Sequence, residues 1–241
     1  MKTLLKKICP DVVFRVVSRV RSRWRNRHLK GAPAEKIFTD IYLSNAWGGA
    51  SVSGMGSDPD QTASLRVGLP QLLRRHAVGS ILDVPCGDFN WMKDIPLAGI
   101  SYLGGDIVED LVTRNRQNHG GPNRGFFTVN LLKESLPAAD LLLCRDCLIH
   151  LSLEDIAVAL GNITRSPIQF LLTTNYPLIK KNGDIVTGDF RAINLRFPPF
   201  SLPEPIEVLP EDCFPEHAGN PNFIRELALW RVDDLAKIIA S

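Results

Sequence analysis

The stretch Ser80-Ile81-Leu82-Asp83-Val84-Pro85-Cys86-Gly87-Asp88-Phe89 decides the fold of this chain. Its apolar start predicts a buried strand, and Asp83 ends that strand just before a tight turn at Gly87. Nineteen residues after Gly87, a second acid, Asp106, ends the strand-like run 100–105. A strand, a glycine turn, a helix and a strand that ends in an acid are typical of the nucleotide-binding half of a doubly wound α/β fold. The stretch therefore predicts a site for a ligand that carries a nucleoside.

The composition of the turn narrows the choice of ligand. A dinucleotide site needs the spacing Gly-x-Gly-x-x-Gly, so that backbone amides can reach a pyrophosphate. Here Gly87 is the single glycine of the turn, and Pro85, Phe89 and Trp91 stand at neighbouring positions. Asp83 would repel a pyrophosphate but would attract an ammonium or sulfonium cation a few ångströms away. The turn therefore disfavours a dinucleotide and favours a cationic nucleoside cofactor.

These residues resemble the first motifs of class I S-adenosylmethionine-dependent methyltransferases. Asp83, Gly87 and Asp106 match the acid, the glycine turn and the ribose-binding acid of that family, although its usual second glycine is absent. The patterns Ser-x-Ser-Gly-x-Gly-Ser at 51–57 and Asp-Val-Pro-Cys-Gly-Asp-Phe-x-Trp-Met at 83–92 are similar to those of a little-characterised bacterial group of these enzymes. The resemblance covers about residues 40–235.

The resemblance implies S-adenosylmethionine as the cofactor. Asn130 stands where the family often has an acid that contacts the adenine amine, and it keeps an acceptor while losing the charge. The cofactor-binding residues implied in this way are Asp83, Pro85, Cys86, Gly87, Asp88, Asp106, Ile107, Asn130, Leu131 and Arg145.

Apolar runs after Asp106 continue the alternation of strands and helices. Strands are predicted at 125–132, 141–146, 168–174 and 228–232, and Ser152 is placed to cap a helix that begins at Leu153. A chain of 241 residues with 44% hydrophobic content can bury one large core. With the resemblance, these features predict one α/β domain, residues 36–241, with a Rossmann-like, doubly wound, seven-stranded sheet that is mostly parallel and has an antiparallel terminal strand.

Residues 44–62 precede the first core helix and are rich in glycine and serine. They predict a flexible loop that either closes over the cofactor or serves as an ordinary linker. Members of the family often cover the methionine end of the cofactor with the segment before the first strand, and this favours a lid. Trp47 and Ser53 are then candidate substrate-binding residues.

Residues 176–222 change in character because prolines become frequent around 198–205, which is unfavourable for a helix. We expect an ordered insertion at the carboxyl edge of the sheet, where it would form a wall of the acceptor pocket. Arg191 and Asn194 could bind a carboxylate, a phosphate or sugar hydroxyls there. Alternatively, Arg191 could pair with Asp184 or Asp189 in a purely structural role.

Two side chains after the fourth strand are candidate catalytic groups, Asp146 and His150. If the acceptor is a hydroxyl, a base assists as its proton leaves, and histidine titrates nearest neutrality. His150 could instead only pack beside the cofactor. Methyl transfer requires no metal, and the five cysteines lie mostly in apolar runs, which predicts reduced thiols rather than metal ligands.

The N-terminal arm, residues 1–35, is strongly basic. Residues 1–30 contain ten Lys and Arg against the single acid Asp11, a net charge of +9 in a chain of +2 overall. Apolar residues recur at helical spacing among these cations, and Arg15 and Arg19 interrupt them well before the roughly 20 apolar residues that a membrane span needs. The arm predicts contact with an anionic membrane surface, a solvated or partner-bound helix, or a mitochondrial presequence; nucleic-acid binding is disfavoured because few aromatic residues are present.

The sequence thus predicts a cytoplasmic methyltransferase that could contact the inner face of a membrane. The basic arm and Arg191 favour O-methylation of a sugar, glycan or lipid-linked saccharide. A soluble small-molecule acceptor is the alternative, as is a catalytically silent fold that acts as a scaffold; a Rossmann oxidoreductase is disfavoured because the glycine-rich turn is missing. The sequence does not define the oligomeric state.

Overall fold

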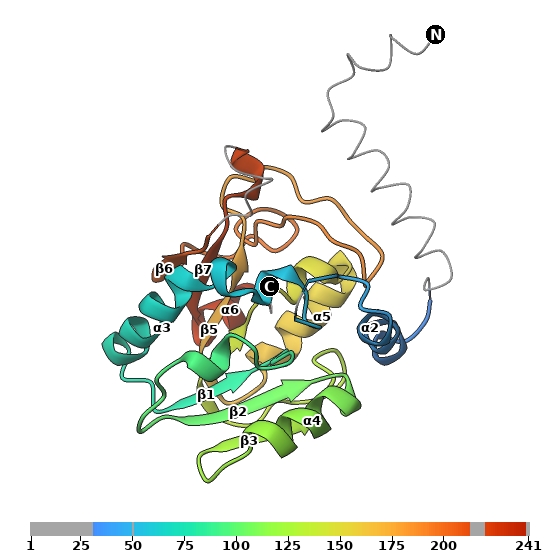
Figure 1. Ribbon diagram of the computed structural model, residues 1–241. Helices are drawn as coiled ribbons and strands as arrows, with labels where there is room; N and C mark the ends of the chain where they lie inside the picture. Colours follow the sequence, from blue (N-terminus) through green and yellow to red (C-terminus); the bar gives the residue numbers. More distant parts are fainter. Residues whose placement is uncertain (1–30, 50, 213–219, 240–241) are drawn as a thin grey trace, which may run out of the picture.

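The computed structural model describes residues 31–49, 51–212 and 220–239. A seven-stranded sheet with the strand order β3-β2-β1-β4-β5-β7-β6 forms its centre (Figure 1). The predictions for residues 1–30 fall outside the described residues.

The first five strands of the sheet are parallel, and β7 is antiparallel to both of its neighbours, β5 and β6. This confirms the predicted fold class. The strand β6 was not predicted, because it lies at the end of the proline-rich segment, and its presence places β7 inside the sheet rather than at the edge. The strands are β1 (Ser80–Asp83), β2 (Ser101–Asp106), β3 (Arg124–Thr128), β4 (Ala139–Cys144), β5 (Ile168–Asn175), β6 (Glu207–Pro210) and β7 (Glu226–Arg231).

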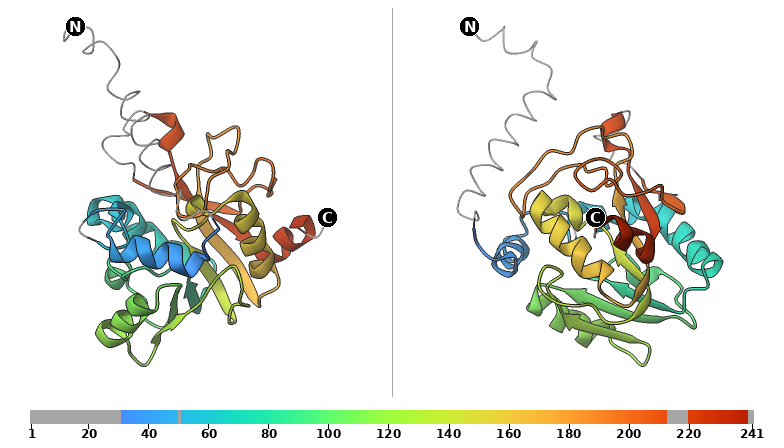
Figure 2. Two further views of the ribbon diagram at one scale, coloured as in Figure 1. Left: turned by 90° about the vertical axis from the view of Figure 1, so that its right-hand side faces the viewer. Right: turned by 180° about the vertical axis from the view of Figure 1, so that it is seen from behind.

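Helices cover both faces of this sheet, as Figure 2 shows, with α3 and α4 on one side and α5 and α6 on the other. Ser152 caps α5 as predicted: its hydroxyl accepts a hydrogen bond from the Asp155 amide at 3.0 Å. The helices are α2 (Ala34–Leu43), α3 (Ala63–Arg75), α4 (Glu109–His119), α5 (Leu153–Thr164) and α6 (Val232–Ile239). Single 3-10 turns are η3 (Met55–Ser57), η4 (Pro59–Gln61), η5 (Met92–Asp94), η6 (Leu148–His150) and η8 (Pro221–Phe223).

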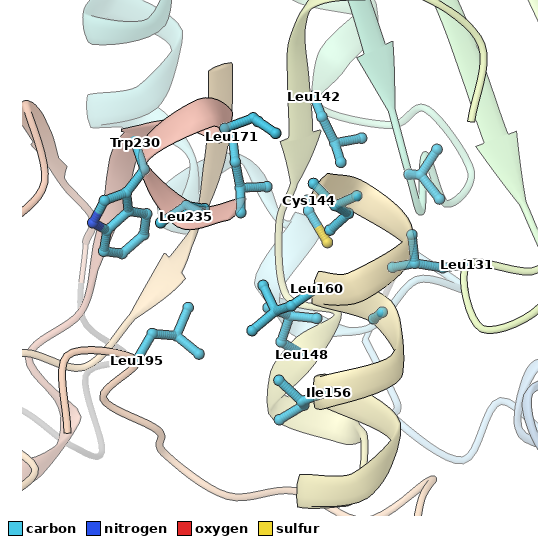
Figure 3. Packing of buried hydrophobic residues seen from close by; sticks show 14 of the residues in the cluster. Leu131, Leu142, Cys144, Leu148, Ile156, Leu160, Leu171, Leu195, Trp230 and Leu235 are labelled. Atoms are coloured by element: carbon cyan, nitrogen blue, oxygen red, sulfur yellow. The ribbon is translucent and has the colours of Figure 1, made fainter. Parts of the chain in front are cut away.

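The central strand β4 divides the core into two layers. Leu142 packs with α5 and α6, whereas Leu141 and Leu143 face α3, because successive side chains of a strand point to opposite faces. Figure 3 shows the layer that holds Leu142, Leu171 and Trp230. Burial of one such leucine contributes about 1.5–3 kcal/mol to the free energy of folding. The two layers together therefore hold the strands, and with them the residues at the carboxyl ends of the strands, in place.

The connection between β1 and β2 corrects one prediction. In place of the expected helix it contains only the 3-10 turn η5. Pro96 cannot donate a backbone hydrogen bond and Gly99 has φ 79°, and both are unfavourable within a helix. The side chains of Phe89 and Met92 are each 1% exposed and cover this part of the sheet instead.

Candidate functional site

A cavity lies at the carboxyl edge of the sheet, where β1, β2 and β4 end. Ligands of doubly wound folds bind at this edge. Another hollow, at the amino edge, is lined mainly by the starts of strands and holds no convergent acids. The residues that line the carboxyl-edge cavity are Phe38, Tyr42, Trp47, Val52, Ser53, Ser57, Asp83, Pro85, Cys86, Gly87, Trp91, Asp106, Val108, Leu111, Arg145 and Asp146.

Asp83, the last residue of β1, is 3% exposed. The Tyr102 hydroxyl donates a hydrogen bond to its Oδ2 atom at 2.6 Å. Burial raises the pKa of Asp83 to about 7, and the bond from Tyr102 only partly offsets that effect. The site therefore holds a carboxylate whose ionised form is poorly stabilised by the protein.

Asp106 is the last residue of β2, and its side chain contacts the glycine turn. Its carboxylate accepts hydrogen bonds from the amide of Gly87 at 3.1 Å and from that of Val108 at 3.0 Å. Burial raises the pKa of Asp106 to about 6 despite these bonds. Neither Asp83 nor Asp106 forms an ion pair with a described residue.

The loop that precedes η3 is seated on the glycine turn. Ser53 Oγ accepts from the Asp88 amide at 2.8 Å and donates to the Asp88 carboxylate at 3.1 Å, while Ser51 Oγ donates to the same carboxylate at 2.8 Å. Gly87 has φ 55°, and a Cβ atom there would lie 2.3 Å from Ser53 Oγ. Only glycine fits this contact, which explains why the turn keeps this one glycine.

Helix α2 supplies lining residues that the sequence analysis missed, Phe38 and Tyr42. Its start is held by Glu35, whose carboxylate accepts from the Asn130 amide at 2.7 Å, and its end by the Tyr42 hydroxyl, which donates to Asp110 at 2.9 Å. Phe38 and Tyr42 are four residues apart in the amphipathic stretch 34–43, and this helical spacing was a signal that could have revealed them. Trp91, Val108 and Leu111 were missed as well.

The structure gathers most, but not all, of the predicted cofactor-binding residues. Asp83, Pro85, Cys86, Gly87, Asp106 and Arg145 line the cavity, together with the candidate substrate residues Trp47 and Ser53. Asp88, Ile107, Asn130 and Leu131 do not. Asp88 accepts hydrogen bonds from the loop before η3, and Leu131 belongs to the hydrophobic core. The Asn130 side chain donates to the Glu35 carboxylate through its nitrogen and accepts from the Leu132 backbone amide through its oxygen.

Asp146 lines the cavity and follows β4 directly. Arg225 contacts its two carboxylate oxygens at 3.2 and 3.3 Å, and Arg145 lies 3.5 Å away. Burial alone would raise the pKa of Asp146, but Arg145 and Arg225 outweigh it and lower the pKa to about 2. Asp146 is therefore ionised at neutral pH and is a weak base.

His150 lies beside the cavity rather than in its wall. Its ring stacks on Trp47 with the centroids 4.9 Å apart, and its Nδ1 atom is 2.8 Å from the Asp189 carbonyl oxygen. A carbonyl can only accept, so Nδ1 carries the proton, and burial lowers the pKa of the ring, which keeps Nε2 unprotonated at neutral pH. His150 is thus the better-suited base of the two candidates.

The proline-rich segment reaches the same place through residues 188–191. The Gly188 amide donates to the His150 carbonyl at 2.8 Å, and Arg191 Nη1 donates to the Leu148 and Ile149 carbonyls at 3.2 and 3.1 Å. The charge of Asp184 acts on Arg191 in the direction of the predicted pairing, because it raises the pKa of the guanidinium against the effect of burial. Burial lowers the pKa of Arg191 to about 10.

Asn194 corrects the prediction of a substrate-binding amide. It is fully buried, and its side-chain amide donates to the carbonyls of Pro177 and Ile179, both at 3.0 Å. These bonds hold the segment's own backbone because a buried carbonyl needs a donor. Neither Arg191 nor Asn194 is among the residues that line the cavity.

The described residues form neither a membrane span nor a metal-binding cluster. No helix among them is long and apolar enough to span a membrane. Within residues 31–49, 51–212 and 220–239, no three His, Cys, Asp or Glu side chains converge as they would around a metal ion.

Comparison with known proteins defines the fold. Neither the protein-family models nor the curated proteins contain a match. Among solved structures, the N-methyltransferase NodS from Bradyrhizobium japonicum WM9, in complex with S-adenosyl-L-homocysteine, is similar at a TM-score of 0.55 and 15% identity over 79% of this chain and 97% of that one. Human N-acetylserotonin methyltransferase, in complex with S-adenosylmethionine, is similar at a TM-score of 0.53 and 15% identity; the match covers 83% of this chain but only 60% of that protein. The chain has the fold of class I S-adenosylmethionine-dependent methyltransferases.

Proposed function

We propose that the chain is an S-adenosylmethionine-dependent methyltransferase. The observation that carries this proposal is the pair of buried acids, Asp83 and Asp106, at the end of neighbouring strands with no ion-pair partner among the described residues. A buried carboxylate without a cation is costly, and a cationic ligand would remove that cost. A nucleoside that carries a sulfonium and an ammonium group fits this pair.

The residues around the cavity could hold the cofactor in a simple way. Asp106 would accept hydrogen bonds from ribose hydroxyls, Asp83 would face the positive charge, and Phe38 and Trp91 would supply apolar contact. When bound, S-adenosylmethionine supplies a methyl group on a sulfonium that is ready for in-line displacement. The remaining contribution of the protein is to position the acceptor, which can supply most of the acceleration.

We further propose a hydroxyl of a sugar, glycan or lipid-linked saccharide as the acceptor. Neutral His150 can take the proton of a hydroxyl at Nε2, because Nδ1 is held by the Asp189 carbonyl. Trp47, which lines the cavity and stacks on His150, would supply an apolar contact to a sugar ring. A soluble small molecule is the alternative acceptor.

Calorimetry with S-adenosylmethionine tests the cofactor assignment. We expect binding by the wild type, loss of about 100-fold or more in affinity in Asp106→Ala, and unchanged binding in Asp233→Ala, which removes an exposed acid of α6. A wild type that does not bind, or an Asp106→Ala variant that binds as well as the wild type, contradicts the proposal. Binding without any methyl transfer identifies a catalytically silent scaffold.

Transfer of a labelled methyl group to fractionated cell extract tests the acceptor. We expect the label in lipid-linked glycans; label confined to the small-molecule pool selects the alternative. Replacing His150 by Gln should reduce the transfer rate by about 100-fold at neutral pH while cofactor affinity is kept.

The net charge of +9 in residues 1–30 supports a peripheral contact with an anionic membrane surface. Flotation of the full chain with phosphatidylglycerol vesicles tests it, with phosphatidylcholine vesicles as the control. Changing Arg19, Arg23 and Arg27 to Glu should abolish the flotation, and equal flotation with both lipids contradicts an electrostatic contact.

A further inference from the structure

Asp146 has a backbone conformation that few residues adopt. Its φ is 51°, in the left-handed region that residues other than glycine adopt uncommonly. Its amide donates to Thr174 Oγ1 at 2.8 Å, and that hydroxyl in turn donates to the Asp146 carboxylate at 3.2 Å. Strand β5 therefore fixes both the backbone and the side chain of Asp146. Such enforced conformations are typical of functional positions.

This carboxylate is one member of a closed set of four charged side chains. Arg225 lies against Asp146 on one side and against Glu211 at 3.0 Å on the other, and Arg145 likewise reaches Glu211 at 2.5 Å and Asp146 at 3.5 Å. The side chains of Glu211, Arg225 and Arg145 are 0%, 3% and 5% exposed, whereas that of Asp146 is 22% exposed. Asp146 and Arg145 both line the cavity, and Asp146 is the more exposed of the two.

The charge of the partly exposed Asp146 carboxylate is fixed by its surroundings. The charged, titratable and polar groups that face Asp146 are Arg145, Arg225, His150 and Thr174, and Arg225 in turn faces Glu211 and Tyr176. The two arginines hold the pKa of Asp146 to about 2. An ionised carboxylate accepts hydrogen bonds and donates none, so it can hold a hydroxyl or an ammonium group and repels a carboxylate.

We propose that Asp146 is the acceptor-binding carboxylate of the cavity, that Arg225 and Glu211 are positioning residues for it, and that it selects acceptors whose nucleophile is a hydroxyl or amine. The inference rests on the proposed methyltransferase function. It divides the work between the two candidate groups: Asp146 orients the acceptor and His150 takes its proton.

Gly56 offers a steric test of this arrangement. Its carbonyl accepts from Arg145 Nη2 at 2.9 Å, and a Cβ atom at Gly56 would lie 2.7 Å from Asp146 Oδ2. Since the carboxylate is held by Arg145 and Arg225, it can move aside only by weakening those contacts. Gly56→Ala should therefore displace Asp146 without touching Asp83 or Asp106. Gly183→Ala is the matched control, because a Cβ there meets nothing within 4 Å.

The experiment compares Asp146→Asn, Arg225→Lys, Arg225→Gln, Gly56→Ala and Gly183→Ala by calorimetry with S-adenosylmethionine and by labelled methyl transfer to the active extract fraction. For Asp146→Asn we expect kcat/KM for the acceptor to fall about 50-fold, with cofactor affinity within about twofold of wild type. Gly56→Ala should lose about tenfold and Gly183→Ala nothing. Arg225→Lys keeps the positive charge and should retain more transfer than Arg225→Gln.

A spectroscopic readout separates positioning from folding. With ¹³C-labelled aspartate carboxyls, the Asp146 signal should not titrate between pH 8 and 4 in the wild type and should begin to titrate in that range in Arg225→Gln. Asp146 titrating above pH 4 in the wild type, or Asp146→Asn transferring as fast as wild type, overturns the inference. Equal losses of cofactor binding and transfer in Asp146→Asn overturn it too, since they would make Asp146 a cofactor residue. A wild type that binds no S-adenosylmethionine is a failure of the proposed function, and the titration still tests the hold of Arg225 on Asp146.

Discussion

Two acidic regions at the carboxyl edge of one sheet have opposite electrostatics. In the region at the ends of β1 and β2, burial raises the pKa of Asp83 to about 7 and that of Asp106 to about 6. In the region at the end of β4, burial acts on Asp146 in the same direction, but Arg145 and Arg225 lower its pKa to about 2. The same residue type thus behaves differently according to whether a cation is built into the protein.

The difference in electrostatics indicates which kind of ligand each region can bind. The acids of the first region receive hydrogen bonds from neutral donors, the Tyr102 hydroxyl and two backbone amides, and these do not neutralise a charge. The second region is already neutral as a set, because two arginines face two carboxylates. The first region is therefore suited to a cationic cofactor, and the second to orienting a neutral or amine-bearing acceptor.

Removal of the built-in cation should have the largest effect on stability. Arg225→Met leaves Asp146 and the buried Glu211 beside a single arginine, and we expect a loss of about 3–5 kcal/mol in the free energy of unfolding. Urea denaturation monitored by tryptophan fluorescence measures it.

The matched control for that change is Arg231→Met, at the far end of β7, the strand that begins directly after Arg225. Arg231 is exposed and lies over the Phe170 ring at 5.4 Å, so its loss should cost about 1 kcal/mol or less. Equal losses in the free energy of unfolding of the two variants would contradict the conclusion that Arg225 neutralises the acids of the second region.

In the first region, a substitution should stabilise the protein instead of destabilising it. Asp83 binds a proton more tightly in the folded than in the unfolded chain, whose Asp pKa is about 3.9, so its contribution to stability falls as the pH rises from about 4 through 7. Asp83→Asn removes that loss and should raise the free energy of unfolding at pH 8 by on the order of 2 kcal/mol while abolishing cofactor binding. Thermal unfolding at pH 5 and pH 8 checks it; a gain that is equal at both values would contradict the assigned pKa.

The affinity for S-adenosylmethionine should depend on pH in the same region. A cationic ligand requires ionised Asp83, so affinity should fall roughly tenfold from pH 8 to pH 6, with protons released on binding near the Asp83 pKa of about 7. Calorimetry in buffers of different ionisation enthalpy measures both quantities. In Asp146→Asn the profile should be unchanged, because Asp146 is ionised throughout this range.

The smallest effect should come from the loop that joins the two regions. Ser53 holds the loop to Asp88 of the first region, while the Gly56 carbonyl holds it to Arg145 of the second. Ser53→Ala should lower cofactor affinity about fivefold, equivalent to the roughly 1 kcal/mol of one hydrogen bond pair. Ser101→Ala, at the start of β2 on the opposite edge, is the control and should change nothing.

Sequence reasoning succeeded where the signal was local. The strand before Asp83, the strand before Asp106 and the Ser152 cap each depend on consecutive residues, and all three are confirmed. It failed between β1 and β2, where Pro96 and Gly99 prevent the expected helix. It also missed helix α2 as part of the cavity, and it placed Asn194 in a pocket although the amide holds its own backbone segment.

By itself, the sequence determined the first region, because strand, turn and acid follow one another along the chain and the parallel pairing of β1 with β2 brings Asp83 and Asp106 to one edge. Only the tertiary structure decided the second region. Arg225 lies far from Asp146 in sequence and reaches it because β7 pairs with β5, while the pairing of β6 with β7 brings Glu211 to Arg225. A charge pattern along the chain cannot show which cations meet which acids, and that meeting is what separates a pKa of about 2 from one of about 7.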